Sequence, residues 1–296
     1  MIVNPANSRS MSQPKTELIL RAAADPALSG AELSDARVLV LAAHPDDETI
    51  GTSAVLGRFP GATAVYLTDG APSDPQFRSP RVSGSRELYA CVRAEEAASA
   101  LSLVDVPQER ILFLSGVDQE AIFRVGELID EFVPILEDFK PSVIITHSYE
   151  GGHPDHDAAA LVARLSAQMV RQNGDAPDVL EMTSYHSAEG KRVAGQFLTP
   201  VSVLAGSIGP TVHLKLSAEE RTRKARMLGC YVSQWHVLSD FPLEPEQLRP
   251  APFYDFTRPP HDGPLWYESL HWPLSGTRWR ELAEQILTEF GELTCQ

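Results

Sequence analysis

The hydrophobic pattern of the chain alternates between short continuous apolar runs and longer segments of helical periodicity. An unbroken apolar run of strand length is typical of a strand that is buried on both faces. Because strand and helix alternate four times, the pattern predicts an α/β fold with a doubly wound, mostly parallel Rossmann-like sheet and helices on both faces. The expected strands are residues 38–43, 64–68, 110–114 and 143–146, and the expected helices are residues 47–58, 86–101, 120–139 and an alanine-rich segment that ends near 172.

The two ends of the chain follow a weaker pattern. Residues 1–30 are expected to form an N-terminal extension with a short amphipathic helix at 16–24, and residues 31–296 a single domain. Beyond residue 172 we expect a loop-rich C-terminal region, and the seven prolines between 240 and 264 argue against regular structure there. The elements expected in this half are strands at 179–186, 201–204 and 212–216 and helices at 218–232 and 277–290.

Two clusters of ionisable residues follow predicted strands. His44-Pro45-Asp46-Asp47-Glu48 comes directly after the first strand, and His153-Pro154-Asp155-His156 comes shortly after the fourth. The carboxyl ends of parallel strands lie on one edge of a sheet, so the clusters can meet in one crevice. A solvated helix cap would explain a lone Asp-Asp-Glu. Crowded ionisable groups at two strand ends instead favour a metal site with its own base.

The residue types suit a catalytic metal. Two imidazoles and one carboxylate, with an open coordination position, make a common catalytic zinc shell. The first cluster offers His44 and one of its aspartates, and Asp47 lies on the same side of a helical turn as His44. The second cluster offers His156 or His153. The same donors also suit Fe²⁺, but the spare acid and base groups favour hydrolysis over oxygen chemistry.

Charge and composition narrow the class of protein. The net charge of −15 argues against a nucleic-acid or anionic-membrane surface, which would need basic patches. Three widely spaced cysteines suit a reducing compartment, and no apolar run reaches membrane-spanning length. The first strand is not followed by a Gly-x-Gly-x-x-Gly loop, which argues against a nucleotide cofactor. A cytoplasmic enzyme or binding protein without a membrane span is the expectation.

Together the two clusters resemble the LmbE-like/PIG-L family of zinc-dependent N-deacetylases, a family that includes N-acetylglucosaminyl deacetylases. The resemblance rests on Ala43 to Glu48 and on His153 to His156. It extends to Thr68-Asp69-Gly70, to an Arg-x-x-Glu helix at Arg93 to Ala97, and to a Lys…Ser-Gln segment at Lys224 to Gln234, so that it covers roughly residues 35 to 235.

The resemblance implies a role for each matched residue. His44, Asp47 and His156 match the zinc ligands, and Asp46 matches the general base. It further implies that His153 stabilises the oxyanion or protonates the leaving amine, that Asp155 orients His153, and that Arg93 lies near the substrate.

Several residues carry weaker signals. Asp69 and Tyr149 lie on predicted strand-end loops and are candidates for sugar contacts, with turn chemistry as the alternative. Glu48 suits either a supporting role at the site or the helix dipole, and a hydrogen-bonded core or rim histidine is the favoured interpretation of His147. A group of aromatic residues in the C-terminal region suits either sugar stacking or packing onto the sheet; its members are Trp235, Tyr254, Trp266, Tyr267 and Trp272.

The sequence and the resemblance together predict a zinc-dependent enzyme that removes an acetyl group from an N-acetylated amino sugar or glycoconjugate. The partner is then a small-molecule or glycoconjugate substrate, and a homo-oligomer is left open. One alternative is a relative that cleaves a larger amide, of the thiol-conjugate amidase type. Another is a metal-binding protein without turnover, against which Asp46 and His153 argue because neither is needed merely to hold zinc.

Overall fold

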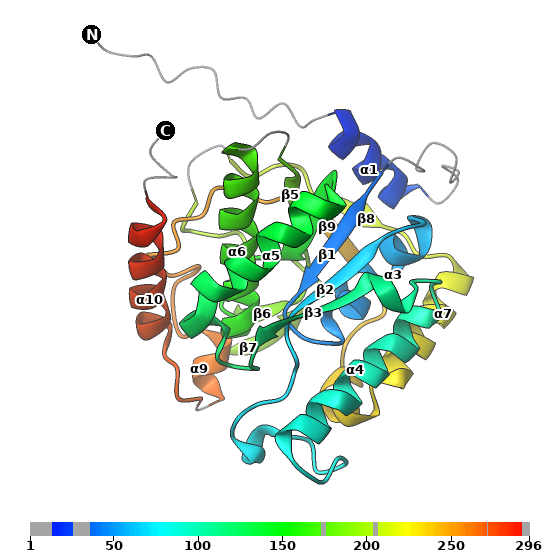
Figure 1. Ribbon diagram of the computed structural model, residues 1–296, viewed down its shortest axis with the longest axis horizontal. Coiled ribbons are helices and arrows are strands. Elements are labelled where there is room, and N and C mark those ends of the chain that lie inside the picture. Colours follow the sequence, from blue (N-terminus) through cyan, green and yellow to red (C-terminus); the bar gives the residue numbers. More distant parts are fainter. Residues whose placement is uncertain (1–13, 26–35, 173–175, 204–206, 271, 292–296) are drawn as a thin grey trace.

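A seven-stranded sheet forms the centre of the protein in the computed structural model (Figure 1). The structure describes residues 14–25, 36–172, 176–203, 207–270 and 272–291. The strands lie in the order β3-β2-β1-β4-β5-β9-β8. Their bounds are β1 Val38–Ala42, β2 Thr63–Thr68, β3 Ile111–Gly116, β4 Val143–His147, β5 Asp178–Met182, β8 Val212–Leu214 and β9 Glu246–Pro250.

The first five strands of this sheet pair in parallel, and β9 and β8 add an antiparallel edge. The strand β1 lies between β2 and β4. From β1 the chain builds outward through β2 and β3 on one side, and it then returns to build β4 and β5 on the other. The order of strands therefore reverses between β1 and β4, which is the topological switch point where α/β sheets bind their ligands.

Alternate residues of β1 point to opposite faces of the sheet, and each face has its own apolar core. Val38 and Val40 belong to one core with residues of α1, α3, α4 and α7. Leu39 and Leu41 belong to the other with residues of α5, α6 and α10. Helices thus cover both faces, as Figure 1 shows. The bounds are α1 Pro14–Ala24, α3 Asp47–Arg58, α4 Arg86–Ser102, α5 Val125–Phe139, α6 Pro154–Gln172, α7 Ala218–Cys230 and α10 Gly276–Glu289.

This architecture confirms the predicted fold class, a mostly parallel α/β sheet with helices on both faces. The four predicted core strands and the helices between them lie within a few residues of their expected positions. The expected extension at 1–30 lies largely outside the described residues. The exception is α1, which packs Ile19 and Ala23 into one of the cores.

Three expectations for the C-terminal half are wrong. Residues 179–186 are not one strand, because β5 ends at Met182 and the chain leaves the sheet to form a hairpin of β6 Tyr185–Ala188 and β7 Lys191–Ala194. At 201–204, Val203 makes one isolated bridge to Tyr254, and residue 204 lies outside the described residues.

The proline-rich segment contains β9, a strand between β5 and β8. Proline is tolerated there because Pro245 precedes the strand and Pro250 ends it, which leaves the N–H groups of residues 246–249 for pairing. Two short helices flank this segment, α8 at Trp235–Leu238 before it and α9 at Trp266–Ser269 after it. Within the described ranges, no helix is both long and apolar enough to cross a membrane.

Candidate active site

The first ionisable cluster lies where β1 ends and α3 begins. The His44 N–H donates to Asp47 Oδ2 at 2.9 Å, and His44 Nδ1 lies 3.1 Å from the same oxygen. The other carboxylate oxygen of Asp47 lies 3.2 Å from Nε2 of His156, at the start of α6. Each of the three residues is at least nine-tenths buried. The fold thus brings together the three residues that the sequence nominated as metal ligands.

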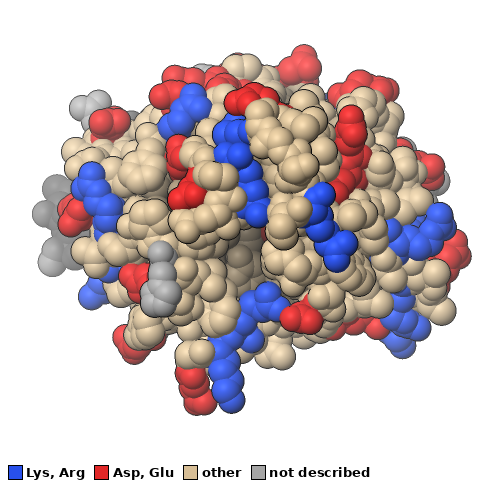
Figure 2. Space-filling view, turned by 90° about the horizontal axis from the view of Figure 1, so that it is seen from below, with Lys and Arg blue, Asp and Glu red and all other residues tan. Residues whose placement is uncertain are grey.

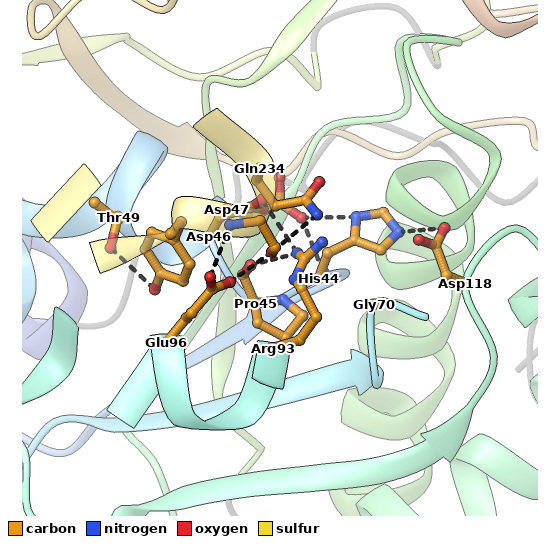
Figure 3. A network of polar contacts seen from close by, with 12 residues as sticks. His44, Pro45, Asp46, Asp47, Thr49, Gly70, Arg93, Glu96, Asp118 and Gln234 are labelled. Carbon is orange, nitrogen blue, oxygen red and sulfur yellow. Dashed lines mark hydrogen bonds and ion pairs between the residues drawn. The ribbon is translucent and has the colours of Figure 1, made fainter. Parts of the chain in front are cut away.

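Asp46 stands beside these residues in a strained conformation. Its φ of 145° lies in a region that residues with a side chain rarely adopt, and such strain tends to cluster at functional sites. The carboxylate accepts a hydrogen bond of 3.1 Å from Arg93 Nη2, and the same nitrogen donates to the Pro45 carbonyl (Figure 3). Arg93 is 3% exposed and holds the candidate base and the turn before it, and its place near the substrate stays a prediction.

Glu48 holds the same turn from the opposite side. Its carboxylate accepts the Asp46 N–H at 3.0 Å and the hydroxyl hydrogens of Tyr231 and Thr49 at 2.5 Å. The side chain is fully buried, and burial raises its pKa. Of the two roles left open for Glu48, the contacts favour support of the Asp46 backbone, since its carboxylate reaches Asp46 and a residue of the distant α7 end.

The end of β2 closes this side of the site through Gly70. Its φ of +63° favours glycine, and a Cβ at this position would lie 2.9 Å from Pro45 Cδ and 3.0 Å from Arg93 Cζ. A side chain here would push Arg93 away from Asp46. Close contact with Pro45 and Arg93 therefore explains why the Thr68-Asp69-Gly70 motif after the second strand ends in a glycine.

The second cluster departs from one expectation. The Asp155 carboxylate was expected to orient His153, but Oδ2 lies 3.9 Å from His153 Nδ1 and 3.1 Å from His44 Nε2. It is the backbone N–H of Asp155 that donates to His153 Nδ1, at 3.1 Å. The carboxylate itself accepts N–H groups of Gln119 and Ala121 from the loop after β3. The helical turn at the start of α6 aims this carboxylate at His44.

Two further residues join the cluster. His147, the last residue of β4, accepts the Ala43 N–H at 3.0 Å and stacks on His156 with ring centroids 3.9 Å apart. It also lies 3.4 Å from Asp47 Oδ2, so it is both a hydrogen-bonded core histidine and a neighbour of the candidate ligands. Asp118, on the loop after β3, lies 3.4 Å from His44 Nε2 and 3.8 Å from His153 Nε2.

Asp118 was missed from the sequence. It stands two residues after the end of β3, and no histidine lies near it in the sequence. The available signal was its place, since it follows a parallel strand whose carboxyl end lies on the same edge as those of β1 and β4.

The two aspartates of the first cluster have opposite electrostatic environments. Burial raises the pKa of Asp46 well above its usual value, and the Arg93 guanidinium offsets only part of this effect. Burial would also raise the pKa of Asp47, but His156 and His147 lower it well below its usual value. Asp47 is therefore suited to remain an ionised ligand and Asp46 to exchange a proton.

The pKa values of the histidines are also shifted in opposite directions. Burial alone would lower the pKa of His44, but Asp118 and Asp155 raise it well above its usual value. For His153, burial and then repulsion from His44 lower the pKa well below its usual value. Burial likewise lowers the pKa of His156. His153 and His156 are thus suited to the neutral form, in which an imidazole nitrogen can bind a metal or donate a single proton.

The remaining predicted substrate residues have different surroundings. Tyr149 is 1% exposed, its hydroxyl donates to the Arg258 carbonyl, and it stacks on Trp279 in the core. The expected sugar contact of Tyr149 is therefore wrong, because the turn after β4 directs this side chain into the packing between the sheet and the C-terminal helix α10. Asp69 is partly exposed and pairs with Arg86 at 2.6 Å, so its contact with a substrate stays a prediction.

The donor set suits a metal ion. Acceptor atoms of carboxylates and imidazoles face one another at 3.1–3.2 Å across a buried space and must share either protons or a cation. Three overlapping groups each bring one ligand atom per residue within 4.8 Å of the others: His44, His153 and His156; His44, Asp118, His153 and Asp155; and Asp47, His147 and His156. The expected set of His44, Asp47 and His156 draws on the first and third of these groups.

Fold and site together define a class of protein, a doubly wound α/β protein with a buried histidine–carboxylate cluster at its switch point.

Figure 2 shows a face of the molecule that is hollowed near its centre, with Lys and Arg side chains beside the hollow.

Comparison with known proteins identifies the family. The family described as PIG-L, GlcNAc-PI de-N-acetylase, matches residues 39–167. A probable N-acetyl-alpha-D-glucosaminyl L-malate deacetylase 2 from Bacillus subtilis is 30% identical over 156 residues, which is 51% of this chain and 69% of that protein. The chain belongs to the PIG-L/LmbE family, and the resemblance seen in its motifs is confirmed.

Other relatives agree with this assignment. A 1D-myo-inositol 2-acetamido-2-deoxy-alpha-D-glucopyranoside deacetylase from Salinispora arenicola is 28% identical over 170 residues, 49% of this chain. The chain spans about half the length of the relatives of this kind that it matches, and it covers 54% of the Salinispora arenicola protein. A solved deacetylase of the teicoplanin biosynthesis pathway shares the fold, with a TM-score of 0.54 at 19% identity over 74% of this chain and 99% of that one.

Proposed function

We propose that this protein is a metal-dependent amide hydrolase that removes the acetyl group from an N-acetylated amino sugar or glycoconjugate. The observation that carries the proposal is Asp46, a buried carboxylate in a strained turn next to the candidate ligands. Arg93 and Glu48 hold it there. A site that only stored a metal would not need it. The names of the relatives, which are deacetylases of N-acetylated glucosaminyl compounds, support the choice of substrate.

His44, Asp47 and His156 would hold the metal, with zinc as the proposed ion and Fe²⁺ as the alternative for the same donors. A bound zinc ion lowers the pKa of a coordinated water from 15.7 to about 7 and polarises a carbonyl oxygen. Metal ligands must be deprotonated, which the low pKa of Asp47 and the neutral form of His156 favour. His44, whose pKa Asp118 and Asp155 raise, would release its proton when the metal binds.

Asp46 would accept a proton from the attacking water. Because burial raises its pKa, it could then return that proton to the departing amine, so that one carboxylate serves both steps. Arg93 keeps this carboxylate in place by its 3.1 Å hydrogen bond. This arrangement extends the role first expected for Asp46.

His153 would stabilise the oxyanion. Its Nδ1 accepts the Asp155 N–H, so the neutral ring carries its proton on Nε2. That Nε2–H can donate to the oxygen that becomes negative during attack, a contact worth about 3–4 kcal/mol. The lowered pKa favours this role over proton donation to the amine.

Acetate release is the direct test. The protein, stripped of metal and reloaded with zinc or Fe²⁺, is incubated with N-acetylglucosamine, N-acetylglucosaminyl glycosides and a longer N-acyl analogue. We expect zinc-restored release of acetate and of a free amine. Preferred release of a larger acid would favour the thiol-conjugate amidase alternative, and zinc uptake without any hydrolysis would favour a metal-binding protein without turnover.

The cellular setting is also a proposal. We propose a cytoplasmic enzyme, on the ground that Cys91 and Cys230 are free thiols. The single-domain organisation of residues 31–296 likewise remains a proposal, and a homo-oligomer stays open.

A further inference from the structure

The C-terminal aromatic residues, for which the sequence left sugar stacking and packing open, have different surroundings in the structure. Tyr267 is fully buried, and Tyr254 packs edge-on against Tyr149. Trp235 is exposed on α8. Trp272 differs from all of these, because its partly exposed indole lies against a residue of the candidate site.

The Trp272 indole meets the His153 imidazole edge to face, with ring centroids 4.6 Å apart and planes at 70°. The Phe77 ring also meets the indole edge to face, with ring centroids 6.2 Å apart. Phe77 belongs to the segment between β2 and α4, so two segments far apart in the chain meet beside His153. We call Trp272 and Phe77 the aromatic wall.

Both segments are anchored, so the wall has a defined position. On the Trp272 side, Leu274 is buried, and the Gly276 N–H donates to Glu268 Oε1 at 2.8 Å, which ties α10 back to α9. On the Phe77 side, the N–H of buried Ser79 donates to the Tyr89 hydroxyl of α4 at 3.1 Å. These bonds reduce the ordering cost of a binding surface, as pre-organisation requires.

The position of the aromatic wall indicates which part of a substrate it would contact. It touches His153, whereas the candidate base Asp46 is held by Arg93 on the α4 side. Asp118 Oδ1 lies 3.8 Å from His153 Nε2, and this carboxylate can accept hydrogen bonds from hydroxyl groups. An apolar ring face next to a hydroxyl acceptor suits a pyranose ring, whose C–H face is apolar and whose rim carries hydroxyl groups.

We propose that Trp272, backed by Phe77, is a specificity-determining residue that stacks on the pyranose ring of the substrate. This inference rests on the proposed function for the reaction, but it concerns recognition of the sugar. The substrate class it names is a pyranose amide, as opposed to a linear N-acetyl amine.

The test compares acetate release from N-acetylglucosamine with that from N-acetylethanolamine, which has the amide but no ring. We expect W272A to raise KM for the sugar about 3- to 10-fold, the range for one aromatic contact, while kcat stays within about 2-fold and kcat/KM for the ringless amide is unchanged. W272F should recover most of the loss. F253A removes an exposed ring that pairs with Arg164 and serves as the matched control.

An equal fall of kcat/KM for both substrates would overturn the inference, because Trp272 would then act only by supporting His153. Unchanged kinetics with the sugar would also overturn it. If neither substrate releases acetate, the proposed function fails, and calorimetric titration of N-acetylglucosamine into the zinc-loaded protein decides the inference alone. Weaker binding by W272A than by F253A would uphold it, and equal or absent binding would overturn it.

Discussion

Two adjacent aspartates after β1 have different roles in the proposed site. Asp46 and Asp47 are neighbours, yet the contacts of one are with Arg93 and those of the other are with histidines. Their pKa values move in opposite directions because of these partners. The division depends on the unusual φ of Asp46, which turns consecutive carboxylates to different neighbours.

Arg93→Met tests the anchoring of the base. Without the 3.1 Å hydrogen bond to Asp46, the carboxylate loses its fixed position, and misplacement of this kind costs about 10- to 100-fold in rate. We expect kcat to fall by that factor while the zinc content stays at the wild-type level. Arg278→Met removes an exposed arginine from α10 and should leave both unchanged. A full kcat in Arg93→Met would show that Asp46 does not need this support.

At the scale of elements, α3 depends on two buried polar contacts. The helix is interrupted at Thr52, where the backbone is not helical. Lys224 of α7 donates to the Ile50 carbonyl at 2.7 Å and to Glu246 of β9 at 2.8 Å, and both charged residues are almost fully buried. One buried ion pair thus joins α3, α7 and β9 behind the candidate site.

Lys224→Met should lower the free energy of unfolding by about 3–5 kcal/mol, because it leaves the Glu246 carboxylate buried without its charged partner. Urea denaturation measures the change. Lys191→Met, at an exposed lysine of β7, is the control. The double variant Lys224→Met/Glu246→Leu should recover part of the loss because no buried charge remains. A loss below about 0.5 kcal/mol, the range for surface substitutions, would contradict this account of the pair.

A second contact between α3 and α7 makes stability depend on pH. Burial alone would raise the pKa of Glu220, but hydrogen bonds from Arg58 and Ser217 lower it to about 2. The stabilisation is therefore present above the unfolded-state pKa of 4.5 and is lost as the pH falls towards 2. Glu220→Gln should cost about 1–3 kcal/mol near neutral pH, and denaturation at several pH values should show that difference shrinking below pH 4.5. A cost that does not change with pH would contradict the assignment.

The parts of the fold that could be predicted from the sequence are those set by local patterns. β1 and β4 are continuous apolar runs, and the motif residues follow their ends. Both the strands and the position of the site could therefore be predicted. β9 was not, because its pairing with β5 and β8 overrides a proline-rich composition. The single strand expected at 179–186 failed because periodicity cannot tell where a chain leaves a sheet.

The same limit applies to individual site residues. Asp47 could be chosen by its spacing from His44, and His156 by the family resemblance. The contacts of Asp155 with His44 and of Asp118 with His153, in contrast, join different strand ends. Contacts of this kind depend on how the loops fold, and Tyr149 was misassigned for the same reason.

At the scale of the whole molecule, the site lies where segments from most of the chain meet. The family match ends at residue 167, yet Trp272 reaches His153 from near the C-terminus. The C-terminal part therefore completes the surroundings of a site whose ionisable groups come from the first half.

Metal binding should stabilise this whole assembly. A ligand at 100 times its dissociation constant adds about 2.7 kcal/mol to the free energy of unfolding, which corresponds to a rise in Tm of about 5 °C for a chain of this size. We expect that rise when zinc is added to chelator-treated protein, measured by differential scanning calorimetry. Magnesium, which prefers oxygen ligands, is the control. An equal rise with magnesium would contradict a site built from imidazoles.

The most direct measurement of the central claim is zinc content and acetate release in two variants side by side. Asp46→Asn should keep one zinc per chain and lose several orders of magnitude in hydrolysis, because it removes the base and leaves the ligands. His156→Ala should lose zinc affinity along with activity, because it removes a ligand. Unchanged turnover in Asp46→Asn, or full zinc affinity in His156→Ala, would contradict the division of labour between base and metal ligands.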